Sequence, residues 1–217
     1  ILMLTAYSVV YVFIFQVRLE QITTPQYVML IFSGLIPFLG FSEGLGNSVI
    51  SVTSNASLVK NTLYPIELIP VKAVLFSQCT EVVGLILLTV AVAVTGLLSP
   101  WLLLGSFQVI FGIGVGWLIS SINVVLRDMQ SLINIISLML MMISPIAYTP
   151  DMIPAGLRPF LRLNPLYYFI TAYQHCFIYG EMPPRDILVA VVLISLGTFL
   201  VGFWVFEKMK QLFDDNI

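Results

Sequence analysis

Ionisable side chains are scarce in this sequence. Among 217 residues there are nine Lys and Arg, eleven Asp and Glu and one His, and the charged fraction is 9% against 59% hydrophobic residues. About a quarter of the residues in soluble domains are charged, and a soluble protein of this size would not cover its surface with so few. Disordered chains are rich in charge and poor in apolar residues, and nucleic-acid binding needs a basic field. The composition therefore indicates an integral membrane protein.

Motifs for covalent chemistry are missing as well. The sequence contains no G-x-x-x-x-G-K-[ST] loop for ATP phosphates, no G-x-S-x-G elbow, no CxxC and no H-E-x-x-H. Cys79 and Cys176 fall in different predicted spans or layers and are interpreted as apolar side chains, with no disulfide or metal implied. An intramembrane serine protease built on Ser48 would need His175 as its base, and we interpret His175 as an interfacial polar residue instead. We expect no catalysis and no cofactor on this chain.

Several runs without charge are long enough to cross a bilayer, which takes about 20 mainly apolar residues in a helix. The runs are continuous rather than alternating, which favours helices over a barrel. The predicted fold class is an all-α integral membrane protein, a single transmembrane domain over residues 1–217. Because the chain begins at Ile1 without an initiator Met, we expect an N-terminal segment to be missing. The six predicted spans are 1–18, 26–48, 72–97, 101–125, 131–149 and 186–206.

Two segments between the spans are more than turns. Residues 51–71 contain a short helical stretch that is stopped near Pro65, with Ser54 or Asn55 as a candidate cap. Residues 150–184 hold six prolines and an apolar stretch too short for a full crossing, which predicts a re-entrant or interfacial helical hairpin that bends at Leu163-Asn164-Pro165. An even number of spans places residues 51–71, the turn at 127–128 and the C-terminus on one side. That side has five Lys and Arg against four, which weakly favours a cytoplasmic location.

Very few charges fall inside the predicted spans. Glu81 lies in the third, with Gln78 on the same helix face. A carboxylate at the bilayer centre costs roughly 2.5–3.5 kcal/mol on insertion scales, so Glu81 should face protein or water. It either hydrogen-bonds between helices or lines a hydrophilic path. The glycine spacings Gly40-x-x-x-Gly44 and Gly112-x-x-x-Gly116 predict close helix packing. There are too few buried charges for a proton- or sodium-driven cycle, so the energy comes from elsewhere or the molecule is a passive channel.

Four stretches match one family pattern in order along the chain. The first is Asn55, Leu58, Val59, Lys60, Tyr64-Pro65, Glu67 and Pro70; the others are Asn123 with Arg127-Asp128, then Ser144-Pro145-Ile146 with Tyr148 and Ile153-Pro154, and finally Asn164-Pro165-Leu166. On these residues the chain resembles the membrane subunit of type-2 ABC exporters that move O-antigen, capsular polysaccharide or teichoic acid. The match covers about residues 47–175. That family has an amphipathic helix before the first span, and we expect it to belong to the N-terminal segment that this sequence does not include.

The resemblance implies a permease subunit without its own ATPase site. It implies a homodimer that docks two ABC ATPase subunits, which bind ATP and Mg, and that exports a lipid-linked glycan across the bacterial cytoplasmic (inner) membrane, with both termini cytoplasmic. Residues 51–71 become the coupling segment, hereafter named so. Lys60 is equally explained as a positive-inside anchor, and Arg127-Asp128 as a local ion pair. The expected ATPase-coupling residues are Lys60, Asn61, Tyr64, Pro65, Arg127 and Asp128.

Aromatic residues also fit a glycan path, because their faces suit sugar C–H surfaces and Tyr hydroxyls can hydrogen-bond sugar hydroxyls. An aromatic belt at the membrane interface explains most of the Tyr residues as well. A type-2 permease for a drug or lipid, and a passive channel or membrane scaffold, stay open as alternatives. The expected path residues are Phe13, Phe15, Phe32, Phe38, Phe41, Gln78, Glu81, Tyr167, Tyr168 and Tyr173.

Overall fold

The computed structural model describes residues 5–7, 9–10, 23–61, 64–93, 101–126, 128–149, 152–154 and 156–213, with the backbone alone at 59–61, 101–102 and 212. All regular elements in these ranges are helical, which confirms the all-α fold class. The main helices are α2 (Thr24–Val49), α3 (Ser51–Ser54), α4 (Ala56–Asn61), α5 (Leu68–Ala93), α6 (Trp101–Val125), α7 (Met129–Ile143), α8 (Arg158–Leu161), α9 (Pro165–Gln174) and α10 (Arg185–Met209). A π-helical turn, η3 (His175–Tyr179), continues α9, and a 3-10 turn, η4 (Lys210–Leu212), follows α10.

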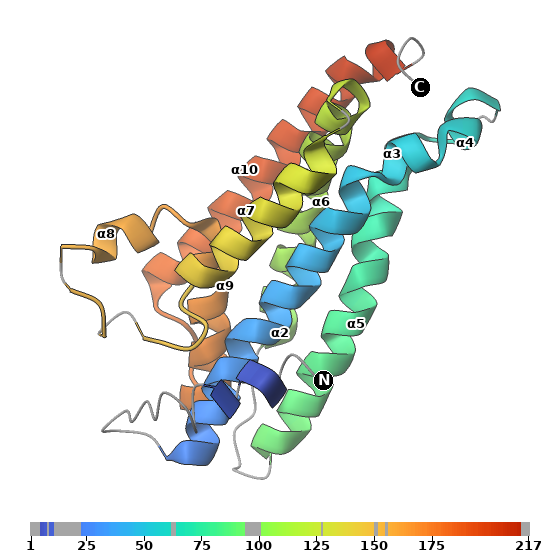
Figure 1. Ribbon diagram of the computed structural model, residues 1–217. Coiled ribbons are helices and arrows are strands. Elements are labelled where there is room, and N and C mark those ends of the chain that lie inside the picture. The colour runs from blue at the N-terminus through green and yellow to red at the C-terminus, as the bar shows by residue number, and fades with distance from the viewer. Residues whose placement is uncertain are drawn as a thin grey trace.

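Four of these helices, α2, α5, α6 and α10, are long and apolar enough to cross a membrane. They coincide with four of the six predicted spans, and they run side by side along the long axis of the bundle (Figure 1). The first predicted span, residues 1–18, falls mostly outside the described residues. The described part of the chain therefore supports a multi-pass membrane protein, and the count of six stays a prediction.

The outer faces of the bundle are apolar, as a lipid environment requires. Phe76 on α5 is 73% exposed and Met142 on α7 is 80% exposed, and similar side chains line the outer face of α10. Soluble monomers rarely expose apolar patches of this extent. The helices thus bury polar groups inside the bundle and turn their apolar faces outward.

The fifth predicted span is shorter than expected. Its helix, α7, has 15 residues and ends at Ile143, whereas the prediction extended to residue 149. Ser144 takes an extended conformation with ψ 141°, because the ring of Pro145 disfavours the helical region for the residue before it. The prediction of this boundary was wrong, although its cause is visible in the sequence.

The segment at 150–184 bends where the sequence predicts. Asn164 is the N-cap of α9, and its side chain accepts a hydrogen bond from the Leu166 amide at 3.0 Å. Gly180, with φ 65°, follows η3 in the left-handed region that favours glycine. However, α8 is a single turn of four residues, so the first arm of the predicted hairpin is short. The re-entrant depth of this hairpin stays a prediction.

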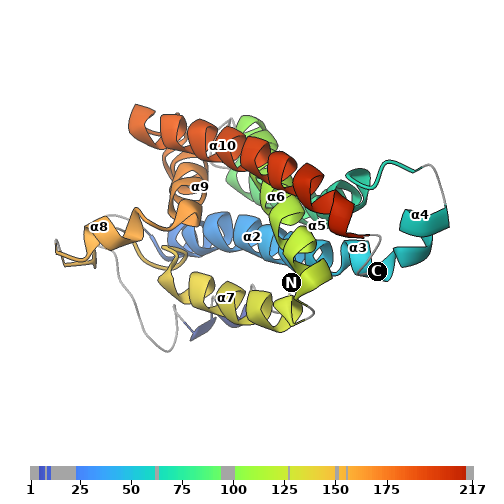
Figure 2. The ribbon, with the colours of Figure 1, turned by 90° about the horizontal axis from the view of Figure 1, so that it is seen from above.

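Helix α2 is the centre of the bundle. Figure 2 shows it between α7 on one side and α9 and α10 on the other, and it also packs along α5. The close packing predicted from glycine spacing is confirmed at Gly116, where an added Cβ would lie 3.1 Å from the Ser48 hydroxyl of α2 and 3.2 Å from Val74 of α5. A large core joins α2 with α5, α6 and α9. A smaller second core joins α3, α5, α6 and the end of α10.

Candidate functional site

The coupling segment projects from one end of the bundle. Figure 1 shows α3 and α4 extending past the ends of α2 and α5, at the same end of the bundle as the C-terminus and the junction of α6 with α7. Val52 of α3 is fully buried in the second core, whereas Ser57 and Leu58 of α4 are exposed. The segment therefore has an anchored half next to α2 and an outward half that a partner can reach.

Side chains fix the turn between α2 and α3. The Ser51 hydroxyl donates to the Ser48 carbonyl at 2.7 Å, and the Asn55 amide donates to the Ser51 carbonyl at 2.7 Å. Asn55 is the C-cap of α3 and directly precedes α4, so one of the two predicted capping residues lies at a helix boundary. These bonds satisfy carbonyls that helix ends leave without partners.

The coupling segment is tied to α6 as well. The buried Asn123 donates its side-chain amide to the Thr53 hydroxyl of α3 at 3.3 Å. Asn123 is one of the residues on which the family resemblance rests. In the structure this hydrogen bond of Asn123 joins the anchored half of the coupling segment to the end of the membrane helix α6.

Glu67, the residue before α5, is held from two further helices. The indole Nε1 of Trp117 on α6 donates to the Glu67 carbonyl at 2.8 Å, and Nζ of Lys210 in η4 lies 2.9 Å from Glu67 Oε2. The Lys210 hydrogen bond lowers the pKa of Glu67, and the same bond raises the pKa of Lys210. Sequence reasoning included Glu67 only as part of a pattern and missed Trp117 and Lys210. A pair 143 residues apart has no local sequence signal.

The expected ATPase-coupling residues gather at this end as far as they are described. Tyr64, 42% exposed, and Pro65 lie on the exposed approach to α5, and the exposed Asp128 occupies the N-cap position of α7. Lys60 and Asn61 are the last residues of α4, where the backbone alone is described. Arg127 lies outside the described residues. Their contact with an ATPase stays a prediction.

A buried polar cluster occupies the interior between α2, α5 and α6. Glu81 is 3% exposed, and the Gln108 side-chain amide donates to both of its carboxylate oxygens at 2.8 Å and to the Pro37 carbonyl at 2.9 Å. The buried Gln78 and the hydroxyl of Tyr173 also face this carboxylate. Glu81 is therefore enclosed by protein and hydrogen-bonds between helices, which is the first of the two interpretations given above.

Four of the six path aromatics that the structure describes are packed inside the protomer. Phe38, Phe41, Tyr167 and Tyr173 are buried, and Phe32 and Tyr168 are half-buried. Rings from three helices stack in a row, with centroid distances of 5.1 Å for Phe41–Phe111 and 5.1 Å for Phe111–Phe169. Phe13 and Phe15 lie outside the described residues. A glycan path along these residues stays a prediction.

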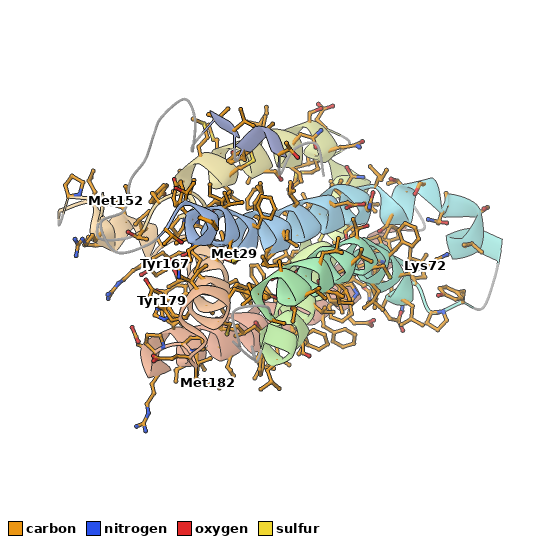
Figure 3. All side chains as sticks on the ribbon, turned by 90° about the horizontal axis from the view of Figure 1, so that it is seen from below. Met29, Lys72, Met152, Tyr167, Tyr179 and Met182 are labelled. Carbon is orange, nitrogen blue, oxygen red and sulfur yellow. The ribbon has the colours of Figure 1, made fainter. Side chains whose placement is uncertain are left out.

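The aromatic hairpin lies far from the coupling segment. Figure 3 shows Tyr167 and Tyr179 near Met29 at one end of the bundle, and Lys72 at the other. The two predicted functional regions, the outward helices of the coupling segment and the aromatic hairpin, are thus at opposite ends of the membrane helices.

Hydrogen bonds at Ser144, Pro145 and Asn164, three residues of the family resemblance, hold the chain that follows α7 against its neighbours. Tyr27 donates its hydroxyl to the Ala147 carbonyl at 2.8 Å, Gln174 donates to the Pro145 carbonyl at 2.7 Å, and the Asn164 amide donates to the Ser144 hydroxyl at 2.9 Å. These bonds connect α7 to α2 and α9. The Ser144-Pro145 motif and Asn164 therefore serve the scaffold. In the described residues no three His, Cys, Asp or Glu side chains gather as a metal site.

Comparison with known proteins places these features in context. A family model described as ABC-2 type transporter matches residues 1–178. An O-antigen export system permease protein RfbA of Klebsiella pneumoniae is 29% identical over 215 residues, covering 95% of this chain and 82% of that protein. A second RfbA from the same organism is 26% identical over 213 residues, covering 95% and 82%. RfbA of Myxococcus xanthus is 24% identical over 220 residues, covering 98% and 84%.

Proposed function

The chain belongs to the ABC-2 type transporter family, and from this premise we propose that it is the permease subunit of an ATP-driven exporter of a lipid-linked polysaccharide. The similar proteins of Klebsiella and Myxococcus carry the name of O-antigen export permeases, which supports this substrate class. The sequence has no phosphate-binding loop of its own. The energy then comes from a separate ATPase that docks on this subunit.

The observation that carries the proposal is the form of the coupling segment. Its outward half, α4, is exposed at the end of the bundle, and its inner half, α3, is packed into the second core by Val52. A push on α4 from a docked ATPase reaches α5 and α6 through a short, packed element. Packed elements move as rigid pieces between discrete arrangements, so a local displacement becomes a helix movement.

The complete transporter is a homodimer of this chain with two ATPase subunits. ATP and Mg bind to the ATPases, and the permeases open a path between the protomers for the glycan. The expected path residues are buried in this conformation, so opening requires helices to shift. The coupling segment faces the cytoplasm, the protein lies in the bacterial inner membrane with both termini cytoplasmic, and the aromatic hairpin at 150–184 meets the outward face.

The coupling role is tested by charge reversal at this end. Lys60→Glu or Arg127→Glu, made in the full complex with its ATPase, should uncouple ATP hydrolysis from glycan export while membrane insertion is unchanged. The measurement is the amount of glycan-lipid exported per ATP hydrolysed. Arg185→Glu is the control, because Arg185 begins α10 at the end of the bundle away from the coupling segment. Wild-type export by both coupling variants would remove the proposed role.

The same assay separates the other candidate functions. ATP hydrolysis that rises with small amphiphiles, and not with glycan-lipid, favours a drug or lipid permease. Movement of solute or glycan-lipid across the membrane without any ATPase favours a passive channel.

A further inference from the structure

Glu67 lies at the junction where the coupling segment enters α5, and two other helices hold it there. Trp117 of α6 binds its backbone carbonyl, and Lys210 after α10 binds its carboxylate. We propose that Glu67, Trp117 and Lys210 form a positioning clamp that carries displacement of the coupling segment to α6 and α10 as well as to α5. The three residues are hereafter called the Glu67 clamp. This inference rests on the proposed function of the coupling segment.

Trp117 and Lys210, the two residues that hold Glu67, are both tied to α10. The Trp117 ring is 5% exposed and packs against Phe199 and Phe203 of α10, with centroid distances of 5.0 and 5.3 Å. Lys210 stands in the turn after α10. The clamp therefore joins the start of α5 to one helix pair, α6 with α10, and not to two unrelated elements.

The turn that carries Lys210 is anchored in the second core. Phe213, just beyond the turn, is fully buried, and its ring lies 5.3 Å from Phe206 of α10. Val52 of the coupling segment belongs to the same core. A shift of the coupling segment thus meets the C-terminal turn both through apolar packing and through the Glu67–Lys210 ion pair.

The ion pair is suited to position a segment rather than to hold the fold. The Lys210 and Glu67 side chains are 32% and 28% exposed, and pairs open to solvent contribute little to stability. Lys210 also lies 3.5 Å from Glu207, one turn earlier. Loss of the Glu67 contact should therefore leave the bundle folded while it frees one arm of the clamp.

The test uses charge exchange in the assembled transporter. Glu67→Lys and Lys210→Glu are made singly and together in the permease, which is purified with its ATPase and reconstituted into liposomes with glycan-lipid. We expect each single variant to lower the glycan exported per ATP by about threefold or more, within the range reported for residues that modulate coupling. The double variant should restore the ratio, because it rebuilds the ion pair with exchanged charges. Glu207→Gln is the matched control and should keep the wild-type ratio.

A role confined to folding would reduce the amount of assembled complex, but not the ratio measured on complex that has assembled. If a charge-reversed single variant does not assemble with the ATPase, Glu67→Gln replaces it, because this change removes the charge of Glu67 without reversing it. The glycan exported per ATP should again fall. Trp117→Phe, which keeps the ring contacts and removes the N–H donor, should lower the ratio too.

A wild-type ratio in the single variants would overturn the proposal, and so would a double variant as poor as the singles. If wild-type complex exports no glycan-lipid, the proposed function itself fails. If wild-type complex exports and Lys60→Glu uncouples it, but the clamp variants do not, only the Glu67 clamp fails.

Discussion

Glu81 shows how far single-residue reasoning reaches. Its position in an apolar span predicts that the carboxylate faces protein or water, and the structure places it against the Gln108 amide inside the bundle. The partner could not be inferred, because 27 residues separate the two along the chain. The Glu81 side chain also needs a glycine at position 40 of α2, because the two lie in direct contact. A Cβ there would overlap the carboxylate and would lie 2.6 Å from the Glu81 Cβ.

Substitution of Gly40 tests this close approach. Gly40→Ala forces α2 away from α5 or pushes Glu81 from its amide partner. Overpacking of this kind costs about 1–3 kcal/mol, so the melting temperature of the protein in detergent should fall by about 2–12 °C. Gly46→Ala on the same helix is the control, since a Cβ there has no atom within 4 Å. Equal melting temperatures for the two variants would show that the Gly40 contact does not limit packing.

At the scale of elements, the tightest helix pair is α6 with α10. A Cβ on Gly202 would lie 2.8 Å from the Gly114 carbonyl carbon, and one on Gly114 would lie 2.6 Å from the Phe199 amide nitrogen. These are backbone contacts, so no side-chain rotation relieves them. The predicted glycine spacings missed this pair, because each helix contributes one glycine to the contact and neither forms a repeat that a single sequence reveals.

Gly202→Ala should therefore separate α6 from α10. This also moves Trp117 away from its rings on α10, so we expect a lower melting temperature together with lower ATP-coupled export. Gly197→Ala is the matched change on α10, where an added Cβ meets nothing within 4 Å. Intrinsic Trp fluorescence and thermal unfolding of both variants provide the measurement. Identical behaviour of the two variants would contradict the close approach of these helices.

At the scale of the whole molecule, the sequence predicts what depends on local composition. Mainly apolar runs of membrane length predict α2, α5, α6 and α10, because crossing a bilayer requires only length and apolarity within one segment. The end of α7 was misplaced because the apolar run continues past Ser144, although the proline after it stops the helix. The Glu67 clamp was not predictable, since its members come from three distant parts of the chain and meet only when the helices pack.

The central claim is that this chain conducts a lipid-linked glycan only when a separate ATPase drives it. The direct test reconstitutes the permease with labelled glycan-lipid in liposomes, alone, with the partner ATPase, and with an ATPase whose phosphate-binding lysine is replaced. The amount of label that becomes accessible on the far side of the membrane is measured after ATP is added. We predict transfer only with the active ATPase and ATP. Transfer by the permease alone, or none with the complete complex, would contradict the account.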